Sequence, residues 1–255
     1  AIPPTASLTF EQVQFAYKDE DWVLRDLSFQ IAPGETVAIV GHTGAGKTSI
    51  TNLMLRFYDV QQGRVLVGGE DVRQLDPIQL RSQFGVVLQD PFLFTGTLRD
   101  NIRLGDAQIT DEEIEAACRQ VNLWDFITSR AEGLDLRVEE RGAGLSTGQK
   151  QLVGFARALV RQPRYLILDE ATASVDTETE QRIQQALAVM LQGRTAVVIA
   201  HRLSTIQRAH RIFVMHHGRL RESGTHQELL RARGIYWRLY QLQYKDQELP
   251  PGLSA

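Results

Sequence analysis

The stretch Gly41-His42-Thr43-Gly44-Ala45-Gly46-Lys47-Thr48 fits the pattern G-x-x-x-x-G-K-[ST]. The residues before it, Thr36 to Val40, form a short apolar run rich in Val and Ile, which is typical of a buried parallel strand. Apolar residues after it recur at the spacing of one helix face: Ile50, Leu53, Met54 and Phe57. The stretch therefore predicts a glycine-rich loop between a strand and a helix.

Such a loop favours a nucleoside triphosphate as its ligand. Glycines let backbone N–H groups converge on phosphate oxygens at the positive end of the helix dipole. Lys47 is then expected to reach the outer phosphates, and Thr48 the Mg²⁺. The alternative is a glycine-rich turn of no chemical consequence, and the strand and helix on either side argue against it.

Composition limits the class of protein. The chain has 255 residues, a net charge of −3 and a pI near 6.1. It therefore has no excess of basic residues, and nucleic acid is not an expected partner. No apolar run approaches the roughly 18 residues of a membrane-spanning helix, and the N-terminal residues lack a signal-peptide pattern. We therefore expect this chain by itself to be soluble.

The single cysteine, Cys118, lies on a predicted helical stripe with Ile114, Ala117 and Val121. We expect it to belong to the core, and one cysteine cannot form a disulfide within the chain.

Hydrophobic alternation predicts antiparallel strands near the N-terminus, over residues 8–15 and 23–31. Tyr17 follows the first of them, where a tyrosine is either a rim aromatic or a surface on which a base can stack. Two further hairpins are predicted, one at Gly68-Gly69 and one at His216-His217-Gly218. The paired histidines make a poor metal site because no third ligand has a suitable spacing.

Two buried strands are predicted to end in polar residues. The strand Phe84 to Leu88 ends at Gln89, which could reach a metal or its water, although a plain loop residue fits the spacing equally. The strand Tyr165 to Leu168 ends in Asp169 and Glu170, and adjacent carboxylates there are costly unless something compensates them. Mg²⁺ on Asp169 would do so, leaving Glu170 to act on water as a general base.

Between these strands, residues 97–162 have a helical pattern and are expected to form a separate lobe. Thr110 and Glu113 form a predicted capping box. The lobe ends in Leu145-Ser146-Thr147-Gly148-Gln149, where Ser146 and Gln149 have the same spacing before a helix that stops at Pro163. A helix start carrying a hydroxyl, a glycine and an amide is also a candidate anion site, and the two interpretations are compatible.

The remaining pattern is mostly helical. Short helices are expected over residues 77–83 and 122–130, a helix capped by Thr177 and Glu180 is expected to reach Leu191, and Thr225 with Glu228 should cap another. A last amphipathic helix is predicted over residues 236–243. A strand over residues 195–200 precedes His201, and a histidine in that place is more often structural than catalytic.

In their order along the chain, these motifs resemble the nucleotide-binding domain of an ATP-binding cassette (ABC) transporter of the exporter type, such as a multidrug or lipid half-transporter. The resemblance runs from about Leu8 to Gln243 and rests on these motifs: Tyr17, Gly41 to Thr48, Gln89, Leu145 to Gln149, Tyr165 to Glu170, Ser174 to Asp176 and His201. Leu145-Ser146-x-Gly148-Gln149 is the most discriminating, because other phosphate-loop enzymes lack it.

The resemblance implies a role for each matching residue. Tyr17 would stack on adenine, and Lys47, Ser49 and the loop amides would hold the phosphates. Thr48, Gln89 and Asp169 would serve Mg²⁺. Glu170 would orient or deprotonate the attacking water, and His201 would contact the γ-phosphate. Ser146, Gly148 and Gln149 of a second copy would close over the ATP, so that two domains pair head to tail.

The resemblance also implies the fold and its divisions. We expect an α/β phosphate-loop NTPase core, with a mixed sheet, an antiparallel β subdomain and an inserted helical subdomain. Residues 1–7 would link to an absent membrane domain, residues 8–96 and 163–243 would form the catalytic core, residues 97–162 the helical subdomain, and residues 244–255 a disordered tail. The full transporter would place this domain on the cytoplasmic side of the inner membrane.

Two residues depart from the family pattern. Thr147 stands where the signature motif has its first glycine, which should cost little because Ser146 and Gly148 are intact. Arg137 stands where the exporter segment that senses the membrane domain has a glutamate, so this chain departs from the family pattern in that segment.

Four alternatives to an exporter motor domain remain open from the sequence. A cassette protein acting on DNA or the ribosome predicts a coiled-coil insertion or a second cassette, and the chain has neither. An importer ATPase subunit is another alternative. A small-molecule kinase would not explain Leu145 to Gln149, and a hydrolytically silent subunit conflicts with intact Lys47, Glu170 and His201.

Overall fold

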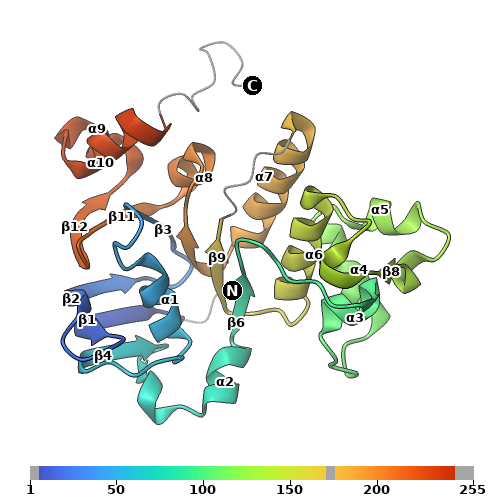
Figure 1. The fold of residues 1–255 in the computed structure, drawn as a ribbon, viewed down its shortest axis with the longest axis horizontal. Helices are drawn as coiled ribbons and strands as arrows, with labels where there is room; N and C mark the ends of the chain where they lie inside the picture. Colours follow the sequence, from blue (N-terminus) through green and yellow to red (C-terminus); the bar gives the residue numbers. More distant parts are fainter. Residues whose placement is uncertain (1–5, 171–175, 245–255) are drawn as a thin grey trace. The chain divides into compact units, whose positions relative to one another are not determined.

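The computed structural model describes residues 6–170 and 176–244. These residues form two compact units, one within residues 1–81 and 195–255 and the other within residues 82–194. Both units mix strands and helices, as expected for an α/β phosphate-loop protein (Figure 1).

The first unit contains an antiparallel sheet in the order β2-β1-β4-β5. Its strands are β1 (Leu8–Ala16), β2 (Trp22–Ile31), β4 (Gln62–Val67) and β5 (Glu70–Asp71), followed by a 3-10 turn over Val72–Gln74 and by α2 (Pro77–Ser82). The predicted pairing of the first two strands is confirmed, with Leu8 opposite Ile31 and Phe10 opposite Phe29.

A bulge explains an irregularity in the alternation of the first strand. The buried residues change phase between Phe10 and Val13, and Gln12 between them has a φ of 47°. The register with β2 shifts at the same place. One extra residue in a bulge restores the inward orientation of the following side chains, so Val13 and Phe15 are buried as well.

The phosphate-loop strand β3 (Thr36–Val40) lies between two parallel neighbours, β10 (Thr195–Ile199) and β11 (Arg211–His216). The last of these forms the expected hairpin with β12 (Arg219–Gly224). All five residues of β3 and of β10 are buried, which is what their continuous apolar runs predict for central parallel strands.

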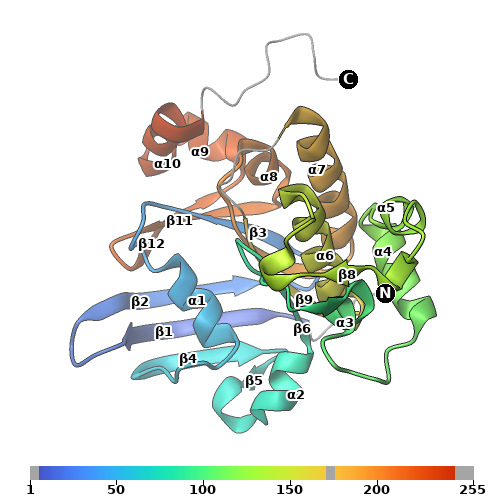
Figure 2. The same cartoon turned by 45° about the vertical axis from the view of Figure 1, so that its right-hand side comes forward.

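Helices complete the first unit. They are α1 (Lys47–Met54), α8 (Leu203–Arg208), α9 (His226–Ala232) and α10 (Ile235–Leu239), and a single π turn over Tyr240–Tyr244 ends the described chain. Helices α9 and α10 lie beside β12, as both ribbon views show (Figures 1 and 2).

The helix after the loop is shorter than its apolar spacing predicted. Ile50, Leu53 and Met54 are fully buried, but the helix ends at Met54 and Phe57 is 54% exposed. The assignment of Phe57 to the buried face was therefore wrong. Arg56 adopts a φ of 50°, and this left-handed residue turns the chain before Phe57.

The second unit contains two strand pairs and a helical region. Strand β6 (Phe84–Val87) pairs in parallel with β9 (Tyr165–Asp169), and β7 (Gly96–Thr97) pairs antiparallel with β8 (Arg137–Val138). The helices are α3 (Leu98–Arg103), α4 (Asp111–Gln120), α5 (Trp124–Thr128), α6 (Thr147–Leu159) and α7 (Thr177–Leu191), with 3-10 turns over Gly133–Asp135 and Glu140–Gly142.

Helices α6 and α7 run side by side (Figures 1 and 2). The predicted core face of α6 is confirmed, because its four stripe residues are buried: Leu152, Phe155, Ala156 and Leu159. Cys118 on α4 is also buried with its predicted neighbours, and burial raises the pKa of its thiol to about 12. A thiol of this kind is unreactive at neutral pH.

Helix caps largely follow the predicted positions. The capping boxes at Thr110 and Glu113, at Ser146 and Gln149, and at Thr225 and Glu228 are all present. For α7 the predicted cap was wrong by one residue, because Asp176 is the N-cap and accepts a hydrogen bond from the amide of Thr179 at 2.9 Å. Hydrogen bonds from the Thr179 side chain, and then from its backbone amide, lower the pKa of Asp176.

Within the described residues, no helix combines the length and apolar character needed to cross a bilayer. The expected tail lies almost wholly outside the described residues, as does Ser174 of the motif Ser174 to Asp176.

Candidate nucleotide-binding site

The loop Gly41 to Gly46 connects the end of β3 to the start of α1, so the predicted strand–loop–helix order is confirmed. His42, Thr43 and Gly44 are exposed, whereas Ala45 and Gly46 are buried against the rest of the unit. The middle of the loop therefore faces solvent while its ends are fixed.

Two of the loop glycines are required by close contacts. A Cβ on Gly41 would lie 2.4 Å from the carbonyl oxygen of Met215 on β11. Gly46 has a φ of 96°, and a Cβ there would lie 2.6 Å from Leu24 Cδ2. No other residue type fits both the conformation and the space, so the loop backbone is held close to the sheet.

The side chain of Lys47 folds back over the loop. Its Nζ donates to the carbonyl oxygens of Gly41 and of His42, the second at 3.1 Å. Gly46, the N-cap of α1, supplies no side-chain acceptor to the first turn of the helix. A lysine ammonium beside a helix start without a side-chain cap forms an anion-binding arrangement, and this fits the phosphates of a nucleotide.

His201 lies at the same edge as the loop. It follows β10, whose residue Ile199 pairs with Ile39 on β3, and the amide of Ala200 donates to the carbonyl oxygen of Ile39 at 3.2 Å. Parallel pairing thus brings the residues after both strands together. His201 therefore follows a strand whose neighbour leads into the loop, and its role at the γ-phosphate stays a prediction.

Tyr17 lies against α1. Its hydroxyl is 2.9 Å from Ser49 Oγ, and the side-chain amide of Asn52 donates to it at 3.2 Å. The Tyr17 side chain is 47% exposed, so it is a rim aromatic that keeps a surface available for a flat ligand.

The second unit brings Gln89 and the carboxylate pair to one edge. In β6 and β9, Val87 pairs with Leu168; Asp169 directly follows Leu168, and Gln89 lies two residues after Val87. Gln89 is exposed, Asp169 is half-buried and Glu170 is only 6% exposed. A buried carboxylate beside a half-buried one is the arrangement in which one group binds a cation and the other can take a proton.

Each unit, taken by itself, carries candidate oxygen donors for Mg²⁺: Thr48 in the first unit, and Gln89 and Asp169 in the second. Among the described residues, no group of three or more His, Cys, Asp and Glu side chains could hold a metal ion by itself. The candidate ligands Thr48, Gln89 and Asp169 offer oxygen atoms, and Mg²⁺ is usually held by one or two carboxylates together with waters and substrate phosphates.

The signature segment, Leu145 to Gln149, spans the start of α6. Ser146 Oγ accepts the amide hydrogen of Gln149 at 3.1 Å, and Gln149 Oε1 accepts that of Ser146 at 2.9 Å. Ser146 is exposed, and its own hydroxyl hydrogen can still be donated to an anion. The cap and the anion site predicted for this residue are thus compatible.

Gly148 has a role that its motif does not reveal. A Cβ at this position would lie 2.2 Å from Thr179 Cγ2 on α7. Thr147, which replaces a family glycine, is exposed and needs no such contact. The helix start therefore tolerates a side chain at position 147 and excludes one at position 148.

The segment after Gln89 is anchored to α6 by polar contacts within the second unit. Arg157 donates to the carbonyl oxygens of Phe92, at 2.8 Å, and Asn101, at 2.7 Å. The Asn101 side chain bonds both the amide and the carbonyl of Phe94, each at 2.8 Å. The rings of Phe92 and Phe94 remain half-exposed.

Sequence reasoning did not identify these anchoring residues, Asn101 and Arg157, nor Asn52 and Gln61 in the first unit. Asn52, Gln61 and Arg157 contact groups at least 35 residues away in the sequence, and Asn101 bonds Phe94 seven residues before it, so no periodic spacing reveals them. The one available signal was an arginine within the otherwise apolar stretch Leu152 to Leu159.

The family model for "ABC transporter" matches residues 24–173. Over 237 residues the chain is 52% identical to an uncharacterized ABC transporter ATP-binding protein, YknV, of Bacillus subtilis, covering 93% of this chain and 39% of that protein. Over 234 residues it is 50% identical to YheH, a probable multidrug resistance ABC transporter ATP-binding/permease protein of the same species, covering 92% of this chain and 35% of that one.

A solved structure agrees with these relatives. A bacterial Atm1-family ABC exporter with ATP bound has a TM-score of 0.87 and 41% identity, covering all of this chain and 43% of that one. The chain thus spans well under half of the length of each of these three proteins. Its motifs, its fold and these similarities agree, and the chain belongs to the ABC transporter family.

Proposed function

We propose that this chain is the ATP-binding and ATP-hydrolysing motor domain of an ABC exporter, attached to a transmembrane domain and placed on the cytoplasmic side of the membrane. The observation that carries the proposal is the loop Gly41 to Gly46, whose contacts with Met215 and Leu24 hold a phosphate-binding backbone that only glycine permits. ATP is the substrate.

Each residue has one task in this proposal. Lys47, Ser49 and the loop amides bind the phosphates, and Tyr17 stacks on the adenine. Glu170 accepts a proton from the attacking water or orients it, and its burial keeps bulk water away from that carboxylate. His201 contacts the γ-phosphate at the edge that it shares with the loop.

Mg²⁺ held by Thr48, Gln89 and Asp169 would neutralise charge on the phosphates. Gln89 contributes a neutral amide oxygen and Asp169 a carboxylate, so the protein adds only one negative charge to the metal site.

A second copy, or a homologous domain, completes each site. Ser146, Gly148 and Gln149 at the start of α6 would bind the γ-phosphate of the ATP held by the other copy. Two-fold symmetry then makes two equivalent sites from one interface. Binding of ATP would join the two domains and hydrolysis would release them, and the attached membrane domain would follow this cycle.

The similarity to proteins named as ABC exporters and permeases favours this function over a soluble cassette protein, an importer subunit or a small-molecule kinase. The division into a core over residues 8–96 and 163–243 and a helical subdomain over residues 97–162 remains part of the proposal.

The test is the variant Glu170→Gln, measured in the full 255-residue chain. Removing the general base should lower the steady-state rate of ATP hydrolysis by about 100-fold or more, while ATP binding persists. The slow variant should also accumulate as a dimer in gel filtration when MgATP is present.

The matched control is Glu112→Gln, which removes the same charge from an exposed position on α4. Its turnover should equal that of the unmodified chain. An unchanged rate in Glu170→Gln would contradict the role given to this carboxylate.

A further inference from the structure

The connection between α1 and β4 carries two side chains that hold Tyr17 and its backbone, and neither belongs to the motifs described above. We propose that Tyr58 and Gln61 are positioning residues for recognition of the nucleotide base, because they fix the ring of Tyr17 in the orientation that stacks. This inference rests on the proposed function and adds the residues that determine the affinity for the base.

Gln61 fixes the backbone directly before Tyr17. Its Nε2 donates to the carbonyl oxygen of Ala16 at 2.8 Å, and its Oε1 accepts the amide hydrogen of Ala16 at 3.1 Å. One side-chain amide thus satisfies both polar groups of a buried residue at the end of β1. The peptide that leads into Tyr17 therefore has little freedom to turn.

Tyr58 fixes the ring itself. The Tyr58 and Tyr17 rings are perpendicular, at 87°, with centroids 4.9 Å apart. The buried ring of Phe15 meets Tyr17 at 79° and 4.7 Å. Two edge contacts of this kind define the plane of a ring that is still 47% exposed.

The far end of the Tyr17 ring is tied to the helix that follows the phosphate loop. Its hydroxyl is bonded to the buried Ser49 and to Asn52, both on α1. The base-stacking surface and the phosphate-binding residues are consequently held by one helix. A flat ligand that stacks on Tyr17 then finds the surface already ordered, and this lowers the entropic cost of binding.

The exposed residues around Tyr17 are aromatic, as is typical of a binding surface. Tyr17 and Tyr58 are each 47% exposed, and the adjacent Phe57 is 54% exposed under the guanidinium of Arg81. Exposed aromatic side chains gathered in one place mark interaction sites more often than they serve stability. Loss of Tyr58 or Gln61 should therefore affect a ligand that has a base more than one that has only phosphates.

The test compares two probes, ATP and inorganic tripolyphosphate, in calorimetric titrations of the full chain with Mg²⁺. In Tyr58→Leu and in Gln61→Glu, the affinity for ATP should fall by about three- to tenfold, while that for tripolyphosphate stays unchanged. Gln61→Glu keeps the size of the side chain and removes the donor to Ala16.

Tyr58→Phe is the matched control. Across residues 6–170 and 176–244, the Tyr58 hydroxyl makes no hydrogen bond, so this variant should bind ATP like the unmodified chain. Thermal unfolding of each variant shows whether the first unit is still folded.

Equal loss of both ligands in Tyr58→Leu and Gln61→Glu would overturn the inference, since it would show a general weakening of the unit. Unchanged ATP affinity in both Tyr58→Leu and Gln61→Glu would also overturn the inference. If Tyr17→Ala also left ATP affinity unchanged, the base site of the proposed function would be wrong, and if the unmodified chain bound no ATP, the proposed function itself would fail.

Discussion

At the residue scale, neighbours in space decide which side chains the signature segment accepts. Thr147 and Gly148 are adjacent at the start of α6, but only position 148 packs against another element. In a helix, alanine is favoured over glycine by about 1 kcal/mol, so propensity alone would make Gly148→Ala stabilising. The contact with Thr179 Cγ2 reverses that expectation.

We predict that Gly148→Ala lowers the free energy of unfolding by about 1–3 kcal/mol, the usual cost of an inserted methyl group in a packed interface. The double variant Gly148→Ala with Thr179→Ser should recover most of this loss, because serine lacks the Cγ2 atom that the new Cβ would meet. Urea-induced unfolding of the single and double variants measures both effects.

Thr179→Ser alone is the control, and it should change stability by less than the Gly148→Ala variant does. If the two substitutions were simply additive, the steric explanation for Gly148 would be wrong.

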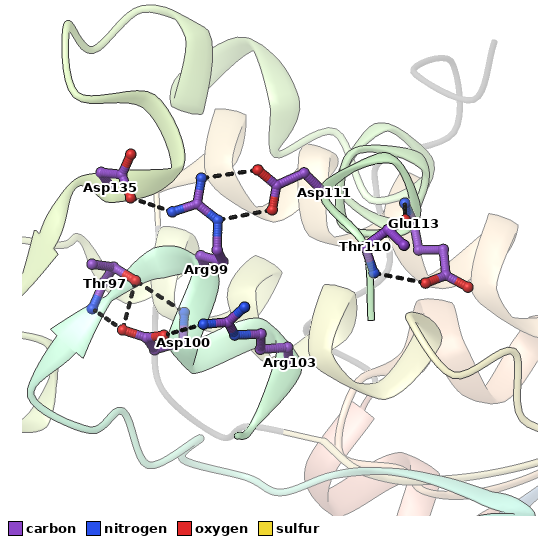
Figure 3. A network of polar contacts seen from close by, with 8 residues as sticks. All are labelled: Thr97, Arg99, Asp100, Arg103, Thr110, Asp111, Glu113 and Asp135. Atoms are coloured by element: carbon purple, nitrogen blue, oxygen red, sulfur yellow. Dashed lines mark hydrogen bonds and ion pairs between the residues drawn. The ribbon is translucent and has the colours of Figure 1, made fainter. Parts of the chain in front are cut away.

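At the element scale, ion pairs join the short helices of the second unit. Helix α3 has six residues and α5 has five, which is too short for an isolated helix to be stable. Arg99 on α3 forms a bidentate pair with Asp111 at the start of α4, at 2.8 and 2.9 Å, and a further pair with Asp135 (Figure 3). One guanidinium thus connects three segments.

The same view shows capping boxes that start α3 and α4. The Thr97 hydroxyl accepts the amide hydrogen of Asp100, and the Asp100 carboxylate bonds Arg103 at 3.0 Å (Figure 3). Hydrogen bonds from the Thr97 side chain are the main cause of the lowered pKa of Asp100.

We predict that Arg99→Met lowers the free energy of unfolding by about 1 kcal/mol at pH 7, a modest value because Asp111 and Asp135 are largely exposed. The Arg99 guanidinium holds the pKa of Asp111 below its usual value. This contribution is present above the unfolded-state pKa of about 4 and is lost as the pH falls through the lower folded-state pKa.

The difference between Arg99→Met and the unmodified chain should therefore shrink at acid pH, as followed by urea unfolding between pH 7 and pH 3. Arg130→Met removes a guanidinium that packs over Phe126 and, among the residues that the structure describes, forms no ion pair, and it serves as the control. A difference that stays constant over this range would contradict the ion-pair explanation.

The elements themselves could mostly be predicted from the sequence, because strands and helices follow hydrophobic periods and caps follow local spacing. The failures occur at the ends of elements and in elements too short to show a period. Phe57 has helical spacing but follows the turn at Arg56, and Asp176 takes the cap one residue before Thr177. The short pair of β7 and β8 was not predicted, since two-residue strands have no period.

At the scale of the whole molecule, each unit carries part of the expected site. Parallel pairing of β3 with β10 brings His201 to the edge of the loop, and pairing of β6 with β9 brings Gln89 to the edge of Asp169 and Glu170. This follows from the rule that polar residues after parallel strands share one edge of a sheet.

The candidate site residues could be proposed from motifs, because the chemistry expected of them requires fixed residue types at fixed spacing. The residues that fix these side chains in place could not be predicted from the sequence, and Gln61 is the clearest example. Its only relation to Tyr17 is a pair of hydrogen bonds to Ala16, which is 45 residues away along the chain. The sequence does not show such contacts, because nothing in the local spacing around Gln61 points to a partner in a distant strand.

The central claim is that ATP is bound between the glycine loop of one copy and the signature helix of another. The most direct test is a crystal structure of Glu170→Gln with MgATP. We predict a head-to-tail dimer in which Ser146 and Gly148 of one copy lie within hydrogen-bond distance of the γ-phosphate bound by Lys47 of the other. An ATP-bound monomer in which Ser146 contacts no phosphate would contradict it.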